Sequence, residues 1–329
     1  LFFLETLVVL RETDLLDITL HMLNIYQQTI TKPLTFSGIS LHSGKKSEMT
    51  IYPGKEDQGI IFKRIDLTKN NVISADYKSV SSARLCTTLE NKFGTKVSTV
   101  EHLLAALYIS EIDNVVIEIN NEEVPIMDGS AKNFLEIFKK TKLKTLNKKR
   151  KYLKILDKIS LIEGEKNISI EPNNQSFEVN FELNYENKII GNQSNNVNFQ
   201  IDDLKDVCES RTFCLFDDIQ KIKKMGLAKG GSLDNAIVVD NDKVLNDDGL
   251  RNEKEFVNHK ILDLAGDFLL SGFRVLGKVN CYQGGHALTN TFLKKLLDSK
   301  SSIKVYELKD DVISKKINNS QSIKLAVSA

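Results

Sequence analysis

The hydrophobic pattern of this 329-residue chain runs through a similar order of elements twice. Between residues 28 and 61 the apolar residues alternate with polar ones and glycines mark turns, which predicts strands. A helical pattern at 98–112, a β-branched run at 114–119 and a second helical pattern at 131–141 follow. Beyond residue 146 the alternation begins again. The chain is therefore expected to fold as two mixed α/β units of similar size.

The second half of the chain repeats this order with longer helices. Three strand patterns come first, at 153–164, 166–172 and 176–185. Helical patterns follow at 216–226 and 255–272, and one more strand and a loop are expected across 273–288. The lysine-rich stretch 140–154 lies between the halves, and we interpret it as a solvated linker, because the rest of the chain balances its charge. We expect units at 22–146 and 147–310, and a C-terminal tail at 311–329.

The first residues, 1–21, are apolar but do not predict a membrane span. Glu5, Arg11, Glu12 and Asp14 interrupt the run well short of a spanning length, and neither a basic first segment nor a small-residue cleavage site marks a signal peptide. We interpret 1–21 as an upstream extension, with a peripheral amphipathic helix as the alternative.

Charge and cysteine content narrow the class of protein. The 45 Lys and Arg residues nearly cancel the 44 Asp and Glu residues, and this +1 net charge does not favour a nucleic-acid partner. Phosphate binding by the lysines at 148–154 is the alternative that this balance disfavours. The 4 cysteines have no C-x-x-C spacing, so neither a disulfide framework nor a thiolate zinc site is indicated, and a reducing compartment fits.

Glu101 and His102 stand at the start of the apolar helical pattern "STVEHLLAAL". Ser98 and Glu101 have the spacing of a capping box, with Ser98 as the N-cap and Glu101 as the third helical residue. That role alone explains Glu101. A single histidine at such a place is more often part of a helix face than a metal ligand, so His102 alone decides nothing.

The helix predicted at 255–272 carries a polar stripe. His259, Asp263 and Asp267 recur at every fourth residue and therefore line one side of the helix. Such groups on an apolar helix are costly unless they are paired or bind a metal. Imidazole and carboxylate ligands suit zinc, which keeps one position open for water in catalytic sites, and His102 would be the third ligand. A solvated helix face with a His–Asp pair explains this segment equally well.

His286 lies in "GGHAL", where flanking glycines allow a close backbone approach to a substrate. We expect it to act as a loop acid or base. Of the other histidines, His21 falls in the extension, and His42 in a turn-rich segment is expected to be structural.

Several ordered blocks then point to one family. They are "STVEHLLAAL", "IDNVVIEINNEEVPIMDGSA", "RTFC", "GGSLDNAIVVD", "LNDDGLRNEKEFVNHKILDLAGD" and "GGHAL". In this order they resemble the zinc-dependent UDP-3-O-acyl-N-acetylglucosamine deacetylases of lipid A biosynthesis, from about Gln28 to His286. The resemblance implies an α+β fold in which two similar α/β domains form a β-α-α-β sandwich with the active site at the domain junction.

The resemblance also implies roles for individual residues. The zinc ligands would be His102, His259 and Asp263; Glu101 would be the general base, Thr212 the oxyanion donor, His286 the general acid and Asp267 its partner. Lys260 would hold the phosphates of the nucleotide sugar, and Phe213 would pack near the sugar. Zinc lowers the pKa of bound water to about 7, so Glu101 would draw a proton from it as the acetamide is attacked.

Further expectations follow from the same resemblance. The substrate would be UDP-3-O-acyl-N-acetylglucosamine, the metal Zn²⁺ with Fe²⁺ as an alternative, and the protein a monomer in the cytoplasm of a Gram-negative bacterium, with at most peripheral membrane contact. We expect the strands at 158–170 to form the wall of the acyl-chain passage. Cys214, Leu215 and Asn235 depart from the residues expected in the family, which affects chain-length preference rather than the chemistry.

Two other functions fit the same residues less well. A zinc amidohydrolase for a different N-acetyl sugar would be distinguished by substrate trials. A non-catalytic binding protein on the same fold would be expected to lack a metal ligand or Glu101, and the chain has all of them.

Overall fold

The computed structural model describes residues 23–308 of the chain. The expectations for residues 1–21, for His21 and for the tail at 311–329 lie outside the described residues. Between residues 23 and 308, no helix has the length and apolar character needed to cross a membrane.

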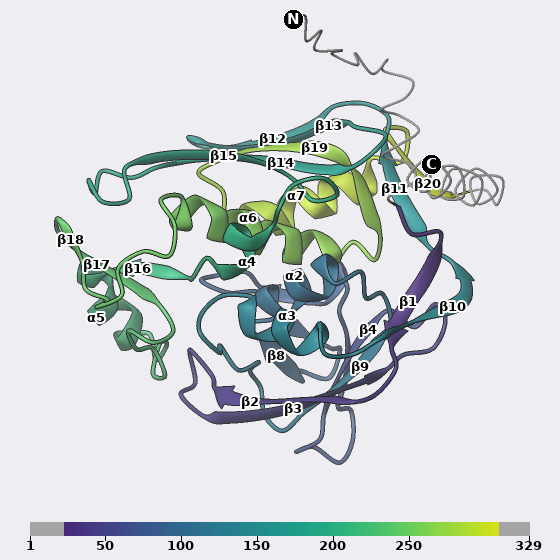
Figure 1. Ribbon diagram of the computed structural model, residues 1–329, viewed down its shortest axis with the longest axis horizontal. Helices are drawn as coiled ribbons and strands as arrows, with labels where there is room; N and C mark the ends of the chain where they lie inside the picture. Colours follow the sequence, from purple (N-terminus) through teal and green to yellow (C-terminus); the bar gives the residue numbers. More distant parts are fainter. Residues whose placement is uncertain (1–22, 309–329) are drawn as a thin grey trace, which may run out of the picture.

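Two outer sheets enclose two layers of helices (Figure 1). The first sheet has the order β2-β3-β9-β4-β5. Its strands are β2 (Leu34–Ile39), β3 (Lys46–Pro53), β4 (Ile60–Arg64), β5 (Val72–Ser74) and β9 (Val115–Ile119). The helices α2 (Glu101–Ile109) and α3 (Lys132–Phe138) cover its inner face. Alternate residues of β3 and β9 are buried, because one face of the sheet packs on these helices.

The second outer sheet has seven strands, with the path β12-β13-β19-β11-β20 and with β14 and β15 joined to β19. Its strands are β11 (Lys151–Ile155), β12 (Ile159–Glu163), β13 (Lys166–Pro172), β14 (Phe177–Asn184), β15 (Asn192–Asn198), β19 (Arg274–Tyr282) and β20 (Ile303–Glu307). Its helices are α4 (Lys205–Glu209), α6 (Glu255–Leu269) and α7 (His286–Asp298). They lie between this sheet and the first helical layer.

Smaller elements complete the described fold. They are the pair β1 (Tyr26–Ile30) and β10 (Leu143–Lys149), the sheet β6 (Val80–Ser82), β7 (Thr88–Glu90) and β8 (Lys96–Ser98), the sheet β16 (Phe213–Leu215), β17 (Ile237–Asp240) and β18 (Lys243–Val244), the helix α5 (Phe216–Lys224) and the 3₁₀ turn η1 (Tyr77–Ser79). In Figure 1, the β16–β18 sheet and α5 project at one end of the sandwich.

The helices α2 and α6 pack unusually closely where they cross. A Cβ atom on Gly266 would lie 2.1 Å from the carbonyl oxygen of Glu101, so only glycine permits this approach. From Glu101 to Tyr108 every residue of α2 is buried, because a sheet covers one side and α6 the other.

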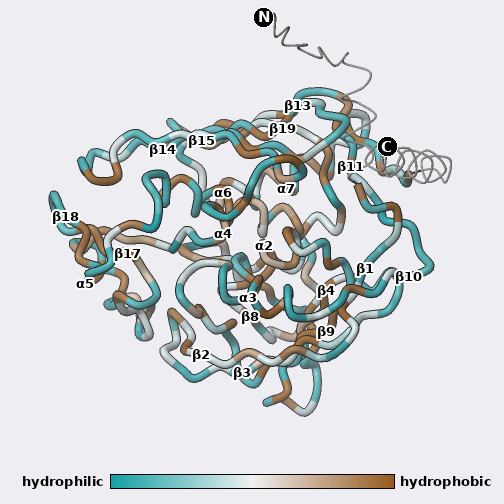
Figure 2. Tube along the Cα trace, viewed as in Figure 1, coloured by the Kyte–Doolittle hydropathy of each residue, from teal (hydrophilic) through white to brown (hydrophobic). Residues whose placement is uncertain are grey.

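The linker interpretation of residues 140–154 is wrong. Most of the stretch forms β10 and β11, and β10 pairs with β1. Its lysines point to solvent while Leu146 is buried, so a basic composition hides an ordinary edge strand. Figure 2 shows β10 as hydrophilic at the rim, in contrast to the hydrophobic β4 and β9.

The expected fold class is confirmed: an α+β chain with two sheets outside and helices inside. The division into units at 22–146 and 147–310 remains a proposal. In its support, the chain leaves β10 and enters the second sheet with β11, on either side of Arg150.

Candidate active site

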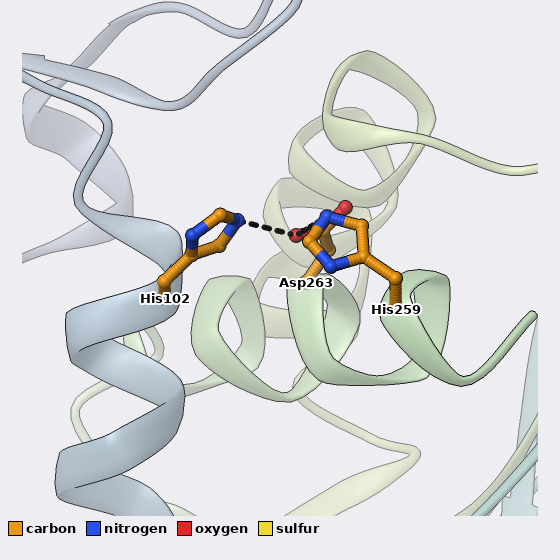
Figure 3. Close-up of side chains that lie close together, drawn as sticks. All are labelled: His102, His259 and Asp263. Atoms are coloured by element: carbon orange, nitrogen blue, oxygen red, sulfur yellow. Dashed lines mark ion pairs between the residues drawn. The ribbon is translucent and has the colours of Figure 1, made fainter. Parts of the chain in front are cut away.

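His102 on α2 and the pair His259 and Asp263 on α6 converge between the two helical layers (Figure 3). The Nε2 atoms of His102 and His259 lie 3.5 Å and 3.3 Å from Asp263 Oδ1. One ligand atom from each residue lies within 4.8 Å of the others, and all three residues are buried. The helical spacing of four places His259 and Asp263 on one face of α6, and the contact at Gly266 brings His102 to them.

The chemistry of these donors fits a metal ion. Asp263 Oδ1 is buried and, within the described part of the chain, has no hydrogen-bond partner, although two imidazoles face it. Burial lowers the pKa of His259 to about 3, so its imidazole is neutral, as a ligand must be. His259 Nδ1 lies 3.1 Å from the carbonyl oxygen of Ser210, which fixes the ring and leaves Nε2 free to bind.

Asp263 is held in its ionised form by its surroundings. Burial would raise its pKa, but His259, Lys260 and His286 outweigh this effect and hold the pKa well below its ordinary value. Lys260 Nζ donates to Asp263 Oδ2 at 3.0 Å, which leaves Oδ1 as the free oxygen. An anionic carboxylate beside a neutral imidazole is a donor set that zinc and similar divalent metals use.

The capping-box prediction for Ser98 and Glu101 is wrong. Ser98 ends β8, and α2 begins only at Glu101, with Val100 as N-cap and no side-chain cap. The carboxylate of Glu101 instead turns into the site, where Oε1 lies 3.5 Å from His286 Nε2. Burial raises the pKa of Glu101, so this carboxylate is a stronger base than an exposed one.

His286 is the first residue of α7 rather than part of a loop, and Gly285 precedes the helix. Its Nδ1 and Asp267 Oδ2 lie 2.7 Å apart. Burial would lower the pKa of His286, but the carboxylates of Asp267, Glu101 and Asp263 outweigh it and raise the pKa to about 10. His286 is therefore protonated at neutral pH, with Nε2 directed at the site.

Phe213 begins β16, and Thr212 directly precedes this strand. The backbone N–H of Thr212 donates to the Gly129 carbonyl at 2.8 Å, and its own carbonyl accepts from Ile237 at 2.8 Å, which fixes the residue between two segments. Lys260 Nζ lies 5.6 Å above the centre of the Phe213 ring. A Cβ atom on Gly129 would lie 2.1 Å from the Asn235 carbonyl oxygen, so glycine is required where the two halves meet.

The structure brings all nine predicted residues into one region. Seven of them line a single small cavity: Glu101, His102, Thr212, His259, Lys260, Asp263 and His286. Asp267 stands behind His286, and Phe213 lines the neighbouring cavity.

Sequence reasoning missed four residues around this cavity. Cys86, Thr99 and His42, which was expected to be structural, line it, and Thr87 contacts three of the predicted residues. His42, Cys86 and Thr87 belong to no periodic pattern, and Thr99 falls in the helical pattern at 98–112 without a spacing that marks a site. The backbone near the site is strained. Four non-glycine residues with positive φ lie just before segments that carry site residues: Leu85, Thr99, Met127 and Gln283.

An apolar cavity of about 370 Å³ adjoins the site. It is lined by residues of β16, α5 and the segment between α5 and β17, with Phe213, Phe216 and Ile219 among its walls. The strands at 158–170, expected to form such a wall, lie in the second outer sheet and do not line it. Their alternating pattern predicted strands correctly but carried no information on which sheet they join.

Comparison with known proteins gives one consistent result. A family model described as LpxC, UDP-3-O-acyl N-acetylglycosamine deacetylase, matches residues 27–298. A protein of Syntrophotalea carbinolica named UDP-3-O-acyl-N-acetylglucosamine deacetylase is 43% identical over 83% of this chain and 88% of its own length. Proteins of the same name from Legionella pneumophila (strain Corby) and Haemophilus ducreyi are 40% and 36% identical, over 83% and 84% of this chain and 90% and 92% of their own lengths.

Proposed function

This chain belongs to the family of UDP-3-O-acyl N-acetylglycosamine deacetylases, and on that premise we propose that it hydrolyses the N-acetyl group of UDP-3-O-(3-hydroxyacyl)-N-acetylglucosamine. The products are acetate and the free 2-amine, at the committed step of lipid A biosynthesis. The observation that carries the proposal is the convergence of His102, His259 and Asp263 beside Glu101 and His286.

His102, His259 and Asp263 hold the metal, which we propose to be Zn²⁺, with Fe²⁺ as the alternative that the same donors accept. Bound there, such a metal supplies Lewis-acid polarisation of the acetamide carbonyl and lowers the pKa of water to about 7.

Glu101 acts as general base. Its Oε1 faces the cavity, and it accepts one proton from the attacking water while the water oxygen bonds to the acetamide carbon. The hydroxyl of Thr212 donates to the carbonyl oxygen as negative charge develops on it; one such donor is typically worth about 10²–10³ in rate.

His286 acts as general acid. An amide anion is a poor leaving group, so the C–N bond breaks only as the nitrogen receives a proton, and His286 Nε2 gives it. Asp267 holds the ring through Nδ1 and keeps it charged beforehand. Glu101 and His286 thus act in opposite directions because their surroundings shift their pKa values differently.

The apolar cavity accepts the 3-O-acyl chain. Its volume of about 370 Å³ lies at the lower end of the roughly 300–1,000 Å³ of small-molecule sites. No residue of α5 is buried, although Phe216 and Ile219 line the cavity, so an acyl chain would cover their inner faces. Phe213 packs near the sugar, and Lys260 contacts the phosphates.

The remaining expectations complete the proposal. The protein acts as a monomer in the cytoplasm, with at most peripheral membrane contact. Nucleic acid is not a partner, because Lys148 and Lys151 of the basic stretch already face Asp57, at 3.3 Å and 3.7 Å.

Acetate release from UDP-3-O-acyl-N-acetylglucosamine by zinc-loaded protein tests the function. Turnover by the wild type is expected to fall by about 10²–10⁴ in Glu101→Ala and to be lost after chelation and regained with zinc. A wild type that binds zinc but releases no acetate would contradict the proposal. A wild type that prefers another N-acetyl sugar would mean that the enzyme is an amidohydrolase for that sugar.

A further inference from the structure

Thr87 directly contacts the groups proposed as base and as partner of the acid. Its hydroxyl donates to Asp267 Oδ1 at 2.7 Å, and its backbone N–H donates to Glu101 Oε2 at 3.1 Å. The hydroxyl oxygen also lies 3.3 Å from His286 Nδ1. Thr87 is 2% exposed and lies immediately before β7, in a segment to which sequence reasoning assigned no role.

The hydroxyl of Thr87 fixes the orientation of Asp267. One oxygen of this buried carboxylate accepts from Thr87 and the other faces His286 Nδ1 at 2.7 Å. With both oxygens engaged, the carboxylate cannot rotate without breaking a bond, and the imidazole that depends on it is held as well. Without the hydroxyl, Oδ1 would be a buried acceptor that has lost its donor.

The backbone of Thr87 fixes the orientation of Glu101. Because Oε2 is anchored by the Thr87 N–H, Oε1 is the oxygen that faces His286 Nε2 at 3.5 Å. A single residue therefore sets the positions of both proton-transferring groups relative to each other.

The surrounding backbone holds Thr87 in place. The carbonyl of Thr87 accepts from the N–H of Val100 at 3.5 Å, directly before α2. Leu85, two residues earlier, has φ of 65°, a conformation that costs a non-glycine residue energy and persists only when its surroundings enforce it.

We propose that Thr87 is a positioning residue of the active site, which keeps Glu101 and the Asp267–His286 pair in the geometry that proton transfer needs. The proposal rests on the roles assigned above to Glu101 and His286. Thr87 does not itself line the cavity and has no contact with His102, His259 or Asp263 among the hydrogen bonds of the described residues, so its effect acts through Glu101, Asp267 and His286.

Three substitutions in zinc-loaded protein test the role. Thr87→Val keeps the shape and the backbone N–H but removes the hydroxyl, and Thr87→Ser restores it. Thr88→Val is the matched control, because the neighbouring hydroxyl donates to Ser98 Oγ at 3.0 Å and otherwise meets the Cys86 thiol at 3.9 Å, with no hydrogen bond to Glu101, Asp267 or His286 in the described part of the chain. We expect kcat to fall by about 10- to 100-fold in Thr87→Val, with KM and zinc content within about two-fold of wild type, and to recover in Thr87→Ser. Thr88→Val should keep kcat within about three-fold.

Several outcomes would overturn the role. They are wild-type kcat in Thr87→Val, an equal loss in Thr87→Ser, an equal loss in Thr88→Val, and a fall in zinc content that parallels the fall in kcat. Each would mean that the hydroxyl is dispensable or that it only supports the fold.

A spectroscopic measurement separates this inference from the proposed function, because it needs no turnover. The His286 Nδ1 proton, buried beside Asp267, should give a far-downfield ¹H resonance that Asp267→Asn removes. We expect the resonance to shift or broaden in Thr87→Val and to return in Thr87→Ser. If the wild type releases no acetate but the resonance behaves in this way, the function fails and the positioning role stands. If the resonance is unchanged in Thr87→Val, the positioning role is wrong.

Discussion

The two ends of helix α2 bury charged groups in opposite ways. At its beginning, three carboxylates, from Glu101, Asp263 and Asp267, lie around His286, and Asp263 Oδ1 has no hydrogen-bond partner in the described part of the chain. Just beyond its end, Arg150 and Arg274 meet Glu111 and Asp113.

At this second end every nitrogen of both guanidinium groups has a hydrogen-bond acceptor. All three nitrogens of Arg150 donate to Glu111 or Asp113, and all three nitrogens of Arg274 donate to Asp113 or to the carbonyls of Tyr108 and Ile112. Arg274 also lies over the Tyr108 ring, 4.5 Å from its centre. This charge cluster joins the junction of β10 and β11, the strand β19 and the end of α2, where the two halves of the fold meet.

The cluster at the end of α2 stabilises the fold, whereas the cluster at its beginning provides reactive groups. A buried charge cluster in which every guanidinium nitrogen has an acceptor holds a fold together, whereas a cluster with a free carboxylate oxygen and crowded like charges is costly unless something binds there. Proteins accept such local conflict mainly at functional sites. Substitutions at the first end should therefore change turnover, and substitutions at the second end should change stability.

The largest effect is expected for Glu101→Gln. Loss of the base should lower kcat by about 10³–10⁴, while the zinc content stays the same. The free energy of unfolding should not fall, since burial already disfavours the charged carboxylate, and the amide removes one of three crowded negative charges. Acetate release and urea denaturation measure the two effects. A loss of stability as large as the loss of activity, compared as free energies, would show that Glu101 supports the fold and not only the reaction.

The opposite result, a loss of stability with turnover retained, is expected for Arg150→Met. It leaves Asp113 and Glu111 without their shared cation and should lower the free energy of unfolding by about 3 kcal/mol. At a temperature where the variant is folded, kcat should stay within about three-fold of wild type. A variant that keeps its stability but loses turnover would show that this cluster serves the reaction rather than the fold.

A smaller loss of stability, together with weaker zinc binding, is expected for Gly266→Ala, which lies between the two ends. The new Cβ atom would lie 2.1 Å from the Glu101 carbonyl oxygen, so α2 and α6 must separate, at a cost of about 1–3 kcal/mol. Zinc affinity should fall as well, because His102 moves away from His259 and Asp263. Gly231→Ala is the control, since its Cβ would meet no heavy atom closer than 3.4 Å. Unchanged zinc affinity in Gly266→Ala would show that the close approach is not what brings the ligands together.

The smallest effect is expected for Glu111→Gln, and it depends on pH. Burial would raise the pKa of Glu111, but Arg274 and Arg150 outweigh it and lower the pKa below its ordinary value. A carboxyl whose pKa is lower in the folded state stabilises the fold above its unfolded pKa, and this contribution is lost as the pH falls through the folded value.

The side chain of Glu111 is 36% exposed, so the variant should lose only about 1 kcal/mol of unfolding free energy at pH 7. The difference from wild type should shrink toward zero below about pH 4. Urea denaturation of both proteins across this range is the measurement, and the subtraction cancels any metal loss that they share. A difference that grows in acid would mean that the ionised carboxylate does not stabilise the fold.

Most of the fold could be predicted from sequence because alternation and helical periodicity are local signals. The strands β2, β3, β9, β11, β12, β13, β14 and β19 and the helices α2, α3, α5 and α6 fall where these patterns predict them, whereas β5 and β20 were not predicted. Local sequence patterns did not predict β10, whose lysines resemble those of a linker. They also did not predict β15, whose asparagines gave no apolar alternation. Which sheet a strand joins also depends on distant partners, so the pattern at 158–170 gave no sign that these strands do not line the apolar cavity.

For the site, the sequence by itself determined the stripe of His259, Asp263 and Asp267, because residues four apart share a helix face whatever surrounds the helix. The ordered blocks that it shares with the family identified the other predicted residues. Only the tertiary structure decided that His102 reaches that stripe, through the close crossing at Gly266, and that Thr87 meets Asp267 and Glu101. Such contacts join segments that are distant in the chain. Local periodicity does not predict these contacts, because only the packing of the whole fold brings the two segments together.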